Sequence, residues 1–335
     1  MLKDLCLING TSGDEGKVRD YIITQIKDYC EYSVDNMGSI IALKKGKKVP
    51  EKKISINAHM DEVGFIVTGI TDDGYLRFTS VGGIDSRVCL DRIVSVGKNS
   101  VKGVIGDKAF HLLTSDEKES CPSFDDLLID IGATSKAEAE KYVSLGDFAY
   151  FESDYSELGN GYIKAKALDD RIGCMLMIEL IQSELQYDTT FCFNVQEEVG
   201  LRGSKCTAFA VDADIAIVLE STTAADLDGV SGADRVCVLG DGPVISFMDN
   251  RTIYDRGLFE LGFAVAKENN IPVQTKTAVA GGNDAGAIQT SGDGVRVMAI
   301  SLPTRYIHSS ASVVKASDID ETRRLLKALL PKLTD

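Results

Sequence analysis

The chain has 335 residues, long enough for about two domains, and its 44% hydrophobic and 26% charged residues are typical of a folded globular protein rather than a disordered or fibrous one. Acidic residues outnumber basic ones by 51 to 36, for a formal net charge of -15, which argues against a nucleic-acid partner or an anionic membrane surface. No targeting pattern opens the chain, and no window approaches the roughly 18 apolar residues that a membrane span needs. We therefore expect a cytoplasmic protein whose eight cysteines are reduced and mostly buried.

The first part of the chain predicts one helix and one strand. Residues 18–30 place apolar side chains three or four positions apart, the pattern of an amphipathic helix, behind a polar SGDEG segment that suits a helix cap. Residues 52–59 alternate isoleucine and alanine with serine and asparagine, the pattern of a half-buried strand. The basic run KKGKKVPEKK at 44–53 is interpreted as a solvated hairpin turn before that strand.

The pattern changes between about residues 64 and 157. Short β-like runs separated by Gly and Asp predict a small β-rich insertion, with helical periodicity only in KAEAEKYVSLG. After residue 164, strands and helices alternate again, which favours an α/β sheet. We expect strands at 189–195, 214–219 and 295–301, and helices at 172–185, 255–270 and 318–330.

Histidines and carboxylates gather where predicted strands end. The chain has only three histidines, and two of them, His59 and His308, lie where a strand gives way to a loop. Ligand sites in open α/β sheets lie outside the carboxyl ends of the strands, so these side chains could meet at one edge of one sheet. The acidic residues in comparable positions are Asp169, Asp170, Glu197, Glu198 and Glu220.

This set of side chains has the composition of a metal site. Two imidazoles with three or four carboxylates suit Zn, Co or Mn, and they exceed what one tetrahedral ion uses. Each residue also has a simpler interpretation, because a strand-end histidine is often only hydrogen-bonded and a DD or EE pair often opens a helix. The metal site is favoured because an ionised group buried without a partner costs on the order of several kcal/mol.

Three other features carry weaker signals. His111 lies inside the β-rich insertion, and we expect it not to be a ligand. The GGNDAG segment at 281–286 either shapes a substrate pocket or is a glycine-rich turn before a helix. The segment NGTSGDEGKV lacks the spacing of a phosphate-binding loop, and no predicted strand leads into it, so that interpretation is rejected.

Six motifs, in order, resemble the M42 family of dinuclear metalloaminopeptidases, which includes glutamyl aminopeptidases and tetrahedral TET aminopeptidases: AHMDEVGF, ALDDRIGC, VQEEVGLRG, VLESTTAAD, GGNDAGAI and TRYIHSS. The resemblance implies a mixed-sheet α/β catalytic domain of the zinc-peptidase type at residues 1–63 and 158–335. It places a β-barrel-like dimerisation domain at 64–157. It also implies a homo-oligomer built from dimers, up to a dodecamer.

The resemblance further implies two divalent metal ions per subunit, with zinc or cobalt foremost and manganese as a third candidate. One ion would be held by His59, Asp169 and Glu220. The other would be held by Asp169, Glu198 and His308, so that Asp169 bridges the two. Many relatives carry Asp at the position of Glu220, and the longer side chain leaves its denticity open.

Catalytic roles follow from the same resemblance. Glu197 would be the general base, and Asp61 would orient His59 through its other ring nitrogen. The expected reaction releases N-terminal amino acids from peptides with a free N-terminus, through a metal-bridged hydroxide. Because adjacent side chains of an extended strand point to opposite sides, we expect Glu198 to face an ion while Glu197 faces the water.

Other activities fit parts of this pattern. A related dinuclear carboxypeptidase or N-deacylase would use the same metal chemistry with a different pocket. A glycoside hydrolase with paired carboxylates and a non-enzymatic assembly protein are more distant alternatives. The sequence leaves the preferred N-terminal residue and the physiological metal open.

Overall fold

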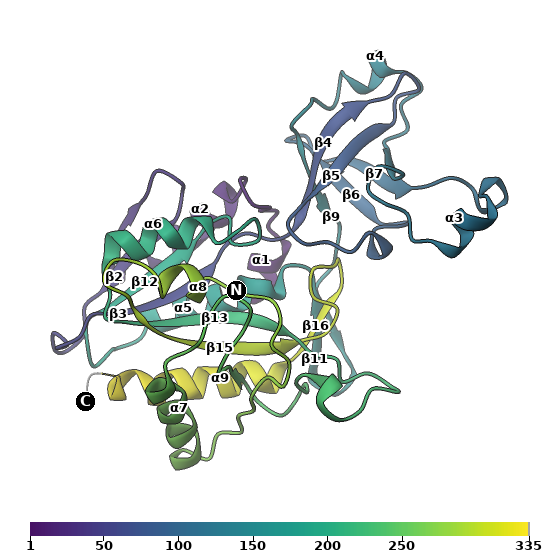
Figure 1. Ribbon diagram of the computed structural model, residues 1–335. Helices are drawn as coiled ribbons and strands as arrows, with labels where there is room; N and C mark the ends of the chain where they lie inside the picture. The colour runs from purple at the N-terminus through teal and green to yellow at the C-terminus, as the bar shows by residue number, and fades with distance from the viewer. Residues whose placement is uncertain (334–335) are drawn as a thin grey trace.

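The computed structural model describes residues 1–333, which form an α/β body and a separate small barrel (Figure 1). The helices are α1 (Leu2–Leu7), α2 (Gly16–Ile26), α3 (Ser115–Glu119), α4 (Lys136–Ala139), α5 (Leu168–Ile181), α6 (Arg202–Val211), α7 (Arg256–Glu268), α8 (Ala285–Ile288) and α9 (Ala316–Leu329). The strands are β1 (Glu31–Val34), β2 (Ile40–Lys44), β3 (Ile54–His59), β4 (Gly64–Ile70), β5 (Leu76–Val81), β6 (Ile93–Val96), β7 (Val101–Gly106), β8 (Leu128–Asp130), β9 (Phe148–Phe151), β10 (Ser156–Leu158), β11 (Tyr162–Ala165), β12 (Thr189–Asn194), β13 (Ile215–Thr223), β14 (Val244–Ile245), β15 (Arg296–Thr304) and β16 (Ser312–Lys315).

The α/β body is built on a seven-stranded mixed sheet with the order β1-β2-β12-β3-β13-β15-β14. Its four middle strands, β12, β3, β13 and β15, run parallel, and antiparallel strands flank them. The predicted mixed-sheet α/β fold is therefore confirmed. The carboxyl ends of the four parallel strands share one edge of the sheet, which is the edge where such folds bind ligands.

Helices cover both faces of this sheet (Figure 1). Along β13, Ile215 and Ile217 belong to the large core that includes α5, α7 and α9, whereas Ala216 and Val218 belong to a second core with α6 and α8. Successive residues of a strand point to opposite faces, so an unbroken apolar run is what a strand covered on both faces requires. This double burial fixes the ends of the parallel strands in place.

Two local predictions near the start of the sheet are wrong. β3 is buried along its whole length, including the polar Ser55 and Asn57, because neighbouring strands and both helical layers cover it. The segment 44–53 is not a hairpin turn: β12 lies between β2 and β3 and pairs with both. The basic run is therefore a connection from β2 to β3 that passes the end of β12, a strand formed by residues much later in the sequence.

The inserted segment forms a closed barrel with the strand order β4-β5-β8-β7-β6-β9. Phe65 lies at its centre and makes edge-to-face contacts with Phe78 and Phe151, with ring centroids 5.1 and 4.9 Å apart. The barrel strands run from Gly64 to Phe151, and the helix expected near residue 140 is reduced to the short α4. Within residues 1–333, no helix combines the length and apolar character needed to cross a membrane.

Candidate metal centre

The candidate metal centre lies at the carboxyl-end edge of the parallel strands. His59 is the last residue of β3, and Glu220 lies near the end of β13. Glu198 follows β12 by four residues, and His308 follows β15 by four. Asp169 enters from the start of α5, after the short strand β11. The sheet thus brings together residues that are far apart in the chain.

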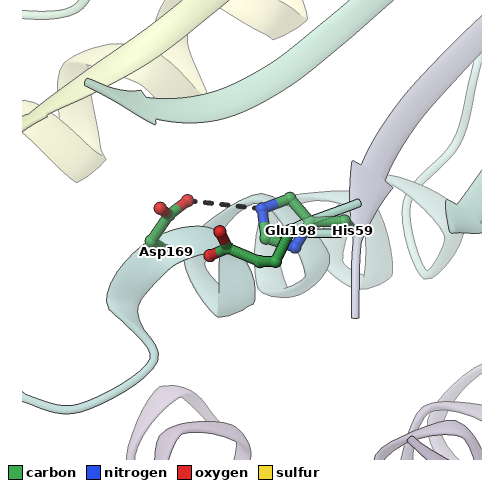
Figure 2. A group of neighbouring side chains, drawn as sticks. All are labelled: His59, Asp169 and Glu198. Carbon is green, nitrogen blue, oxygen red and sulfur yellow. Dashed lines mark ion pairs between the residues drawn. The ribbon is translucent and has the colours of Figure 1, made fainter. Parts of the chain in front are cut away.

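Asp169 lies between the two histidines. Its Oδ1 is 3.4 Å from Nε2 of His59, and its Oδ2 is 3.3 Å from Nε2 of His308. Glu220 Oε1 lies 3.4 Å from the same His59 nitrogen, and Glu198 Oε2 lies 3.3 Å from the same His308 nitrogen. The five residues therefore form two three-residue groups that share Asp169. Figure 2 shows His59, Asp169 and Glu198 turned toward one another.

Both imidazoles present the same nitrogen to this centre. His59 Nδ1 lies 3.0 Å from the backbone carbonyl oxygen of Asp61, and His308 Nδ1 lies 2.7 Å from that of Gly83. A carbonyl oxygen only accepts hydrogen bonds, so each Nδ1 carries a proton and donates it to the carbonyl, which leaves Nε2 of each ring facing the carboxylates. Metal-binding histidines are commonly oriented in this way. Gly83 belongs to the segment after β5, so the barrel side of the molecule orients one of the histidines.

The buried oxygens of the cluster fit a pair of cations. Within residues 1–333, Asp169 Oδ1 and Glu220 Oε2 are buried and accept no hydrogen bond. Glu220 Oε1 accepts the backbone N–H of Ser221 at 3.1 Å, so its other oxygen is the one left free. Buried carboxylate oxygens without donors are costly unless a cation is present. The donor set of two imidazoles and three carboxylates suits Zn, Co or Mn.

The pKa values of the cluster reflect its concentrated negative charge. Burial lowers the pKa of His308, but the Glu198 and Asp169 carboxylates outweigh burial and raise it to about 10. His59 behaves in the same way, because Glu220 and its other acidic neighbours hold its pKa well above the ordinary value. Burial raises the pKa of Glu198 to about 7. A site with this much negative charge in a buried setting attracts divalent cations.

The backbone of Glu197 and Glu198 is held by Asp61. One Asp61 carboxylate oxygen accepts the N–H of Glu197 at 3.0 Å, and the other accepts the N–H of Glu198 at 3.1 Å. Gln196, just before them, has a φ of 55°. β12 ends at Asn194, so the two glutamates lie in a turn and not on a continued strand. The expectation that strand alternation separates their side chains is therefore wrong; a left-handed turn held by a carboxylate positions them instead.

The segment NGTSGDEGKV supports the same turn. The Ser12 hydroxyl donates to Asp61 Oδ2 at 2.6 Å. Glu15 Oε1 accepts the N–H of Gln196 at 3.0 Å and that of Gly13 at 2.9 Å. Three consecutive N–H groups, those of residues 196–198, thus end on two buried carboxylates. Sequence reasoning missed the role of Glu15; its only sequence signal is an acidic residue in a glycine-rich segment without a phosphate-loop spacing.

A cavity of about 950 Å³ opens over the centre. Asp169, Glu197, Glu198, Glu220 and His308 all line it. The Glu197 carboxylate accepts no hydrogen bond from residues 1–333. Burial raises its pKa well above the ordinary value, and the nearby Glu220 and Glu198 carboxylates raise it further. The arrangement offers a proton-accepting carboxylate beside a cation site, in a space large enough for a peptide end.

The remaining sequence candidates are placed as follows. Asp170 lies beside His59 and Glu220, closely enough to count among possible ligands, but its oxygens accept the backbone N–H groups of His59 and Gly173 at 3.3 and 3.1 Å. His111 is exposed in the barrel insertion, away from the centre. The 281–286 segment is a turn before a helix, as one of its two interpretations expected, since α8 begins within it; its residues 281–283 also line the cavity.

Comparison with known proteins identifies the family. The family model described as M42 glutamyl aminopeptidase matches residues 38–325. The chain belongs to the M42 peptidase family. The M42 aminopeptidases are peptide hydrolases, and this chain is one of them. The putative aminopeptidase FrvX of Escherichia coli K12 is 37% identical to it over 341 residues, covering 100% of this chain and 95% of FrvX.

Solved structures of M42 peptidases share its fold. A TET aminopeptidase from a marine sediment archaeon of the Thaumarchaeota is 37% identical, covers 99% of this chain and 95% of its own, and has a TM-score of 0.94. The TET1 peptidase of Pyrococcus horikoshii is 38% identical, covers 98% of both chains and has a TM-score of 0.87. That peptidase assembles into a tetrahedron or a large octahedral shell.

Proposed function

We propose that this M42 peptidase is a dinuclear metalloaminopeptidase that releases N-terminal residues from peptides. The observation that carries the proposal is the position of Asp169, whose two oxygens lie 3.4 Å from His59 Nε2 and 3.3 Å from His308 Nε2. Asp169 would be shared between one ion held with His59 and Glu220 and another held with Glu198 and His308. When bound, two divalent ions polarise a carbonyl oxygen and lower the pKa of a water molecule.

Glu197 is the residue that would move the proton. Its carboxylate faces the cavity and has no hydrogen-bonding partner among residues 1–333 that would compete for a water molecule. Burial raises its pKa, and so do the neighbouring Glu220 and Glu198 carboxylates, which makes it a stronger base than an ordinary glutamate. Glu197 would accept a proton from the attacking water and then return it to the amine that leaves.

Asp61 would position both the base and a metal ligand. Its carboxylate holds the backbone of Glu197 and Glu198, and its backbone carbonyl fixes the ring of His59. His59 Nδ1 lies farther from the Asp61 carboxylate, at 3.4 Å, than from the carbonyl at 3.0 Å. The main orienting contact is therefore the carbonyl, and the carboxylate serves chiefly the glutamate turn.

A matched pair of substrates tests the aminopeptidase assignment. A short peptide and its N-acetylated form are incubated with metal-loaded protein, and the released amino acids are identified. An aminopeptidase removes the first residue of the free peptide and leaves the acetylated one intact. Cleavage of both forms at similar rates would point to a carboxypeptidase or N-deacylase and would contradict the proposal.

We also propose that the protein works as a homo-oligomer, assembled from dimers through the barrel domain at 64–157 and reaching up to twelve subunits. The assembly of the similar Pyrococcus horikoshii TET1 peptidase supports this proposal. Light scattering coupled to size exclusion tests it, and a monomer at micromolar concentration would contradict it. We place the assembly in the cytoplasm, since all eight cysteines are free; cell fractionation tests that location.

A further inference from the structure

The segment 10–15 lies between the barrel and residues 196–198, here called the catalytic turn. The chain enters the barrel at β4 and leaves it after β9 (Figure 1). A Cβ added at Gly64, the first residue of β4, would clash with Oγ1 of Thr11 and lie 3.0 Å from the carbonyl oxygen of Ala149 in β9. The segment therefore packs closely against the place where the barrel joins the α/β body.

A hydrogen bond joins the barrel to this segment. The hydroxyl of Tyr150, in β9, donates to Oδ2 of Asp14. Tyr150 is only 7% exposed, and a hydrogen bond to a carboxylate is stronger than one between neutral groups. The backbone N–H of Asp14 donates to the carbonyl oxygen of Thr11 at 2.7 Å, which closes the segment into a turn. The barrel thus holds the middle of a compact segment.

The residue after Asp14 extends this contact to the catalytic turn. Oε1 of Glu15 accepts the N–H of Gln196 at 3.0 Å. The same oxygen accepts the N–H of Gly13 at 2.9 Å, so the Glu15 side chain is bound to its own segment as well. Asp14 and Glu15 are neighbours in the chain, and one contacts the barrel while the other contacts the turn. A displacement of Asp14 would therefore move Gln196, whose φ of 55° directs the chain into Glu197.

Ser12 forms a second contact between the segment and the catalytic turn. Its hydroxyl donates to Asp61 Oδ2 at 2.6 Å. Asp61 in turn accepts the N–H groups of Glu197 and Glu198 at 3.0 and 3.1 Å. The segment thus contacts the turn on both sides of Asp14, the residue that the barrel holds. The position of the barrel and the position of the turn are set by the same few residues.

We propose that Tyr150 is a positioning residue for the base Glu197, acting from the barrel through Asp14 and Glu15. This inference rests on the proposed function, in which Glu197 moves the proton. A catalytic group has to be held accurately, since a misplacement of about 1 Å costs on the order of 100-fold in rate. The barrel would then contribute to the catalytic step as well as to assembly.

The first test removes the hydroxyl alone. In Tyr150→Phe, kcat for release of the first residue from a peptide should fall about 3- to 10-fold, because the turn loosens, while KM and metal content stay within about twofold of wild type. Tyr142→Phe is the matched control, since it makes the same change at a barrel tyrosine that is 53% exposed, and its kcat should equal that of the wild type.

Asp14 allows a rescue experiment. Asp14→Ala removes the acceptor and should lower kcat as much as Tyr150→Phe does. Asp14→Asn retains one accepting oxygen for the Tyr150 hydroxyl, so it should keep kcat within about twofold of wild type. Equal losses in the Ala and Asn variants would show that the contact with Tyr150 does not act on the turn, and would overturn the proposal.

A double-mutant cycle separates positioning through Glu15 from a general effect on the fold. In Glu15→Ala the contact with Gln196 is already broken, so adding Tyr150→Phe should lower kcat by less than about twofold further. An additive loss in the double variant would mean that Tyr150 acts by another path, and the proposal would fail.

Amide hydrogen exchange tests the same contact without an activity assay. The N–H groups of residues 196–198 should exchange faster in Tyr150→Phe than in the wild type or in Tyr142→Phe. Unchanged exchange there, or a wild-type kcat in Tyr150→Phe, would overturn the inference and leave the aminopeptidase function standing. If the wild type releases no N-terminal residue from any peptide, the proposed function fails, and the catalytic role of Tyr150 fails with it.

Discussion

Asp61 holds Glu197 through the backbone: its carboxylate accepts the Glu197 N–H at 3.0 Å and, with its other oxygen, the Glu198 N–H at 3.1 Å. The two glutamates belong to different functions in our account, one a base and the other a metal ligand. A single buried carboxylate therefore sets the positions of both. Burial raises the pKa of Asp61, but the nearby His59, the Ser12 hydroxyl and the Glu197 N–H outweigh burial and keep that pKa below its ordinary value.

Replacing Asp61 by Asn should damage both functions together. An Asn side chain has one accepting oxygen, so at least one of the two N–H groups would face an amide NH₂ and lose its partner. We expect a stability loss of about 1–3 kcal/mol and a fall in metal affinity of about 10- to 100-fold. Denaturant unfolding and metal titration measure the two effects. Unchanged metal affinity in Asp61→Asn would contradict the positioning role.

The contact made by Glu15 should survive replacement by glutamine and be lost on replacement by alanine. Its Oε1 accepts two backbone N–H groups, and glutamine retains an oxygen able to accept both. Glu15→Gln should keep kcat within about threefold of wild type, whereas Glu15→Ala should lower kcat about tenfold or more, because Gln196 loses its acceptor and the turn carrying Glu197 loosens. Steady-state kinetics separate kcat from KM. Equal activity in the two variants would show that the contact does not position the turn.

Glu197→Gln should separate catalysis from metal binding. The amide is nearly the same shape as the carboxylate but cannot accept the proton of a water, so kcat should fall about 10²- to 10⁴-fold. Metal content, measured by atomic emission on the same samples, should stay that of the wild type. Glu184→Gln is the matched control, because this side chain is 84% exposed and pairs with Lys47 on the surface. Near-normal turnover in the Glu197 variant would remove its assignment as the base.

A pH dependence of stability should arise from the pair of Asp226 and Arg305. Two arginine nitrogens lie 2.6 Å from the two Asp226 oxygens, and this pair anchors the chain just before His308. Burial alone would raise the pKa of Asp226, but the arginine contacts lower it below the unfolded value. Stability from the pair is therefore complete above the unfolded pKa and lost as pH falls through the folded pKa.

The variant Asp226→Asn checks that dependence. It should cost about 1–3 kcal/mol at neutral pH, and its unfolding free energy should vary less with pH in the acidic range than that of the wild type. Urea unfolding at several pH values measures both. Parallel curves for variant and wild type across the acidic range would mean that the pair contributes no pH dependence.

Much of the fold could be predicted because its signals are local. The apolar runs that became β12, β13 and β15 are continuous and end in charged or polar residues, and the periodicity of α7 and α9 is clear in sequence. The order of strands in a sheet depends on residues far apart in the chain. The 44–53 connection was interpreted as a hairpin turn because no residue near it indicates that β12 lies between β2 and β3. The same non-local coverage made β3 buried on both faces.

The residues of the candidate site also differ in whether their positions depend on local sequence or on distant contacts. The residues at strand ends, such as His59 and Glu220, could be predicted because position and chemistry coincide in the sequence. The turn at Glu197 could not, since it depends on a left-handed Gln196 and on acceptors from Glu15 and Asp61, which lie more than 130 positions away. Gly83, which orients His308 through a backbone carbonyl, carries no side-chain signal at all.

The most direct test of the central claim is a metal titration of the stripped enzyme, followed by release of the first residue from a peptide with a free N-terminus. Because Asp169 lies between two ligand groups, we predict that activity rises until two equivalents of divalent metal are bound per chain, and that Asp169→Asn impairs both binding steps. Full activity in excess chelator, or saturation of binding and activity at one equivalent, would contradict the account.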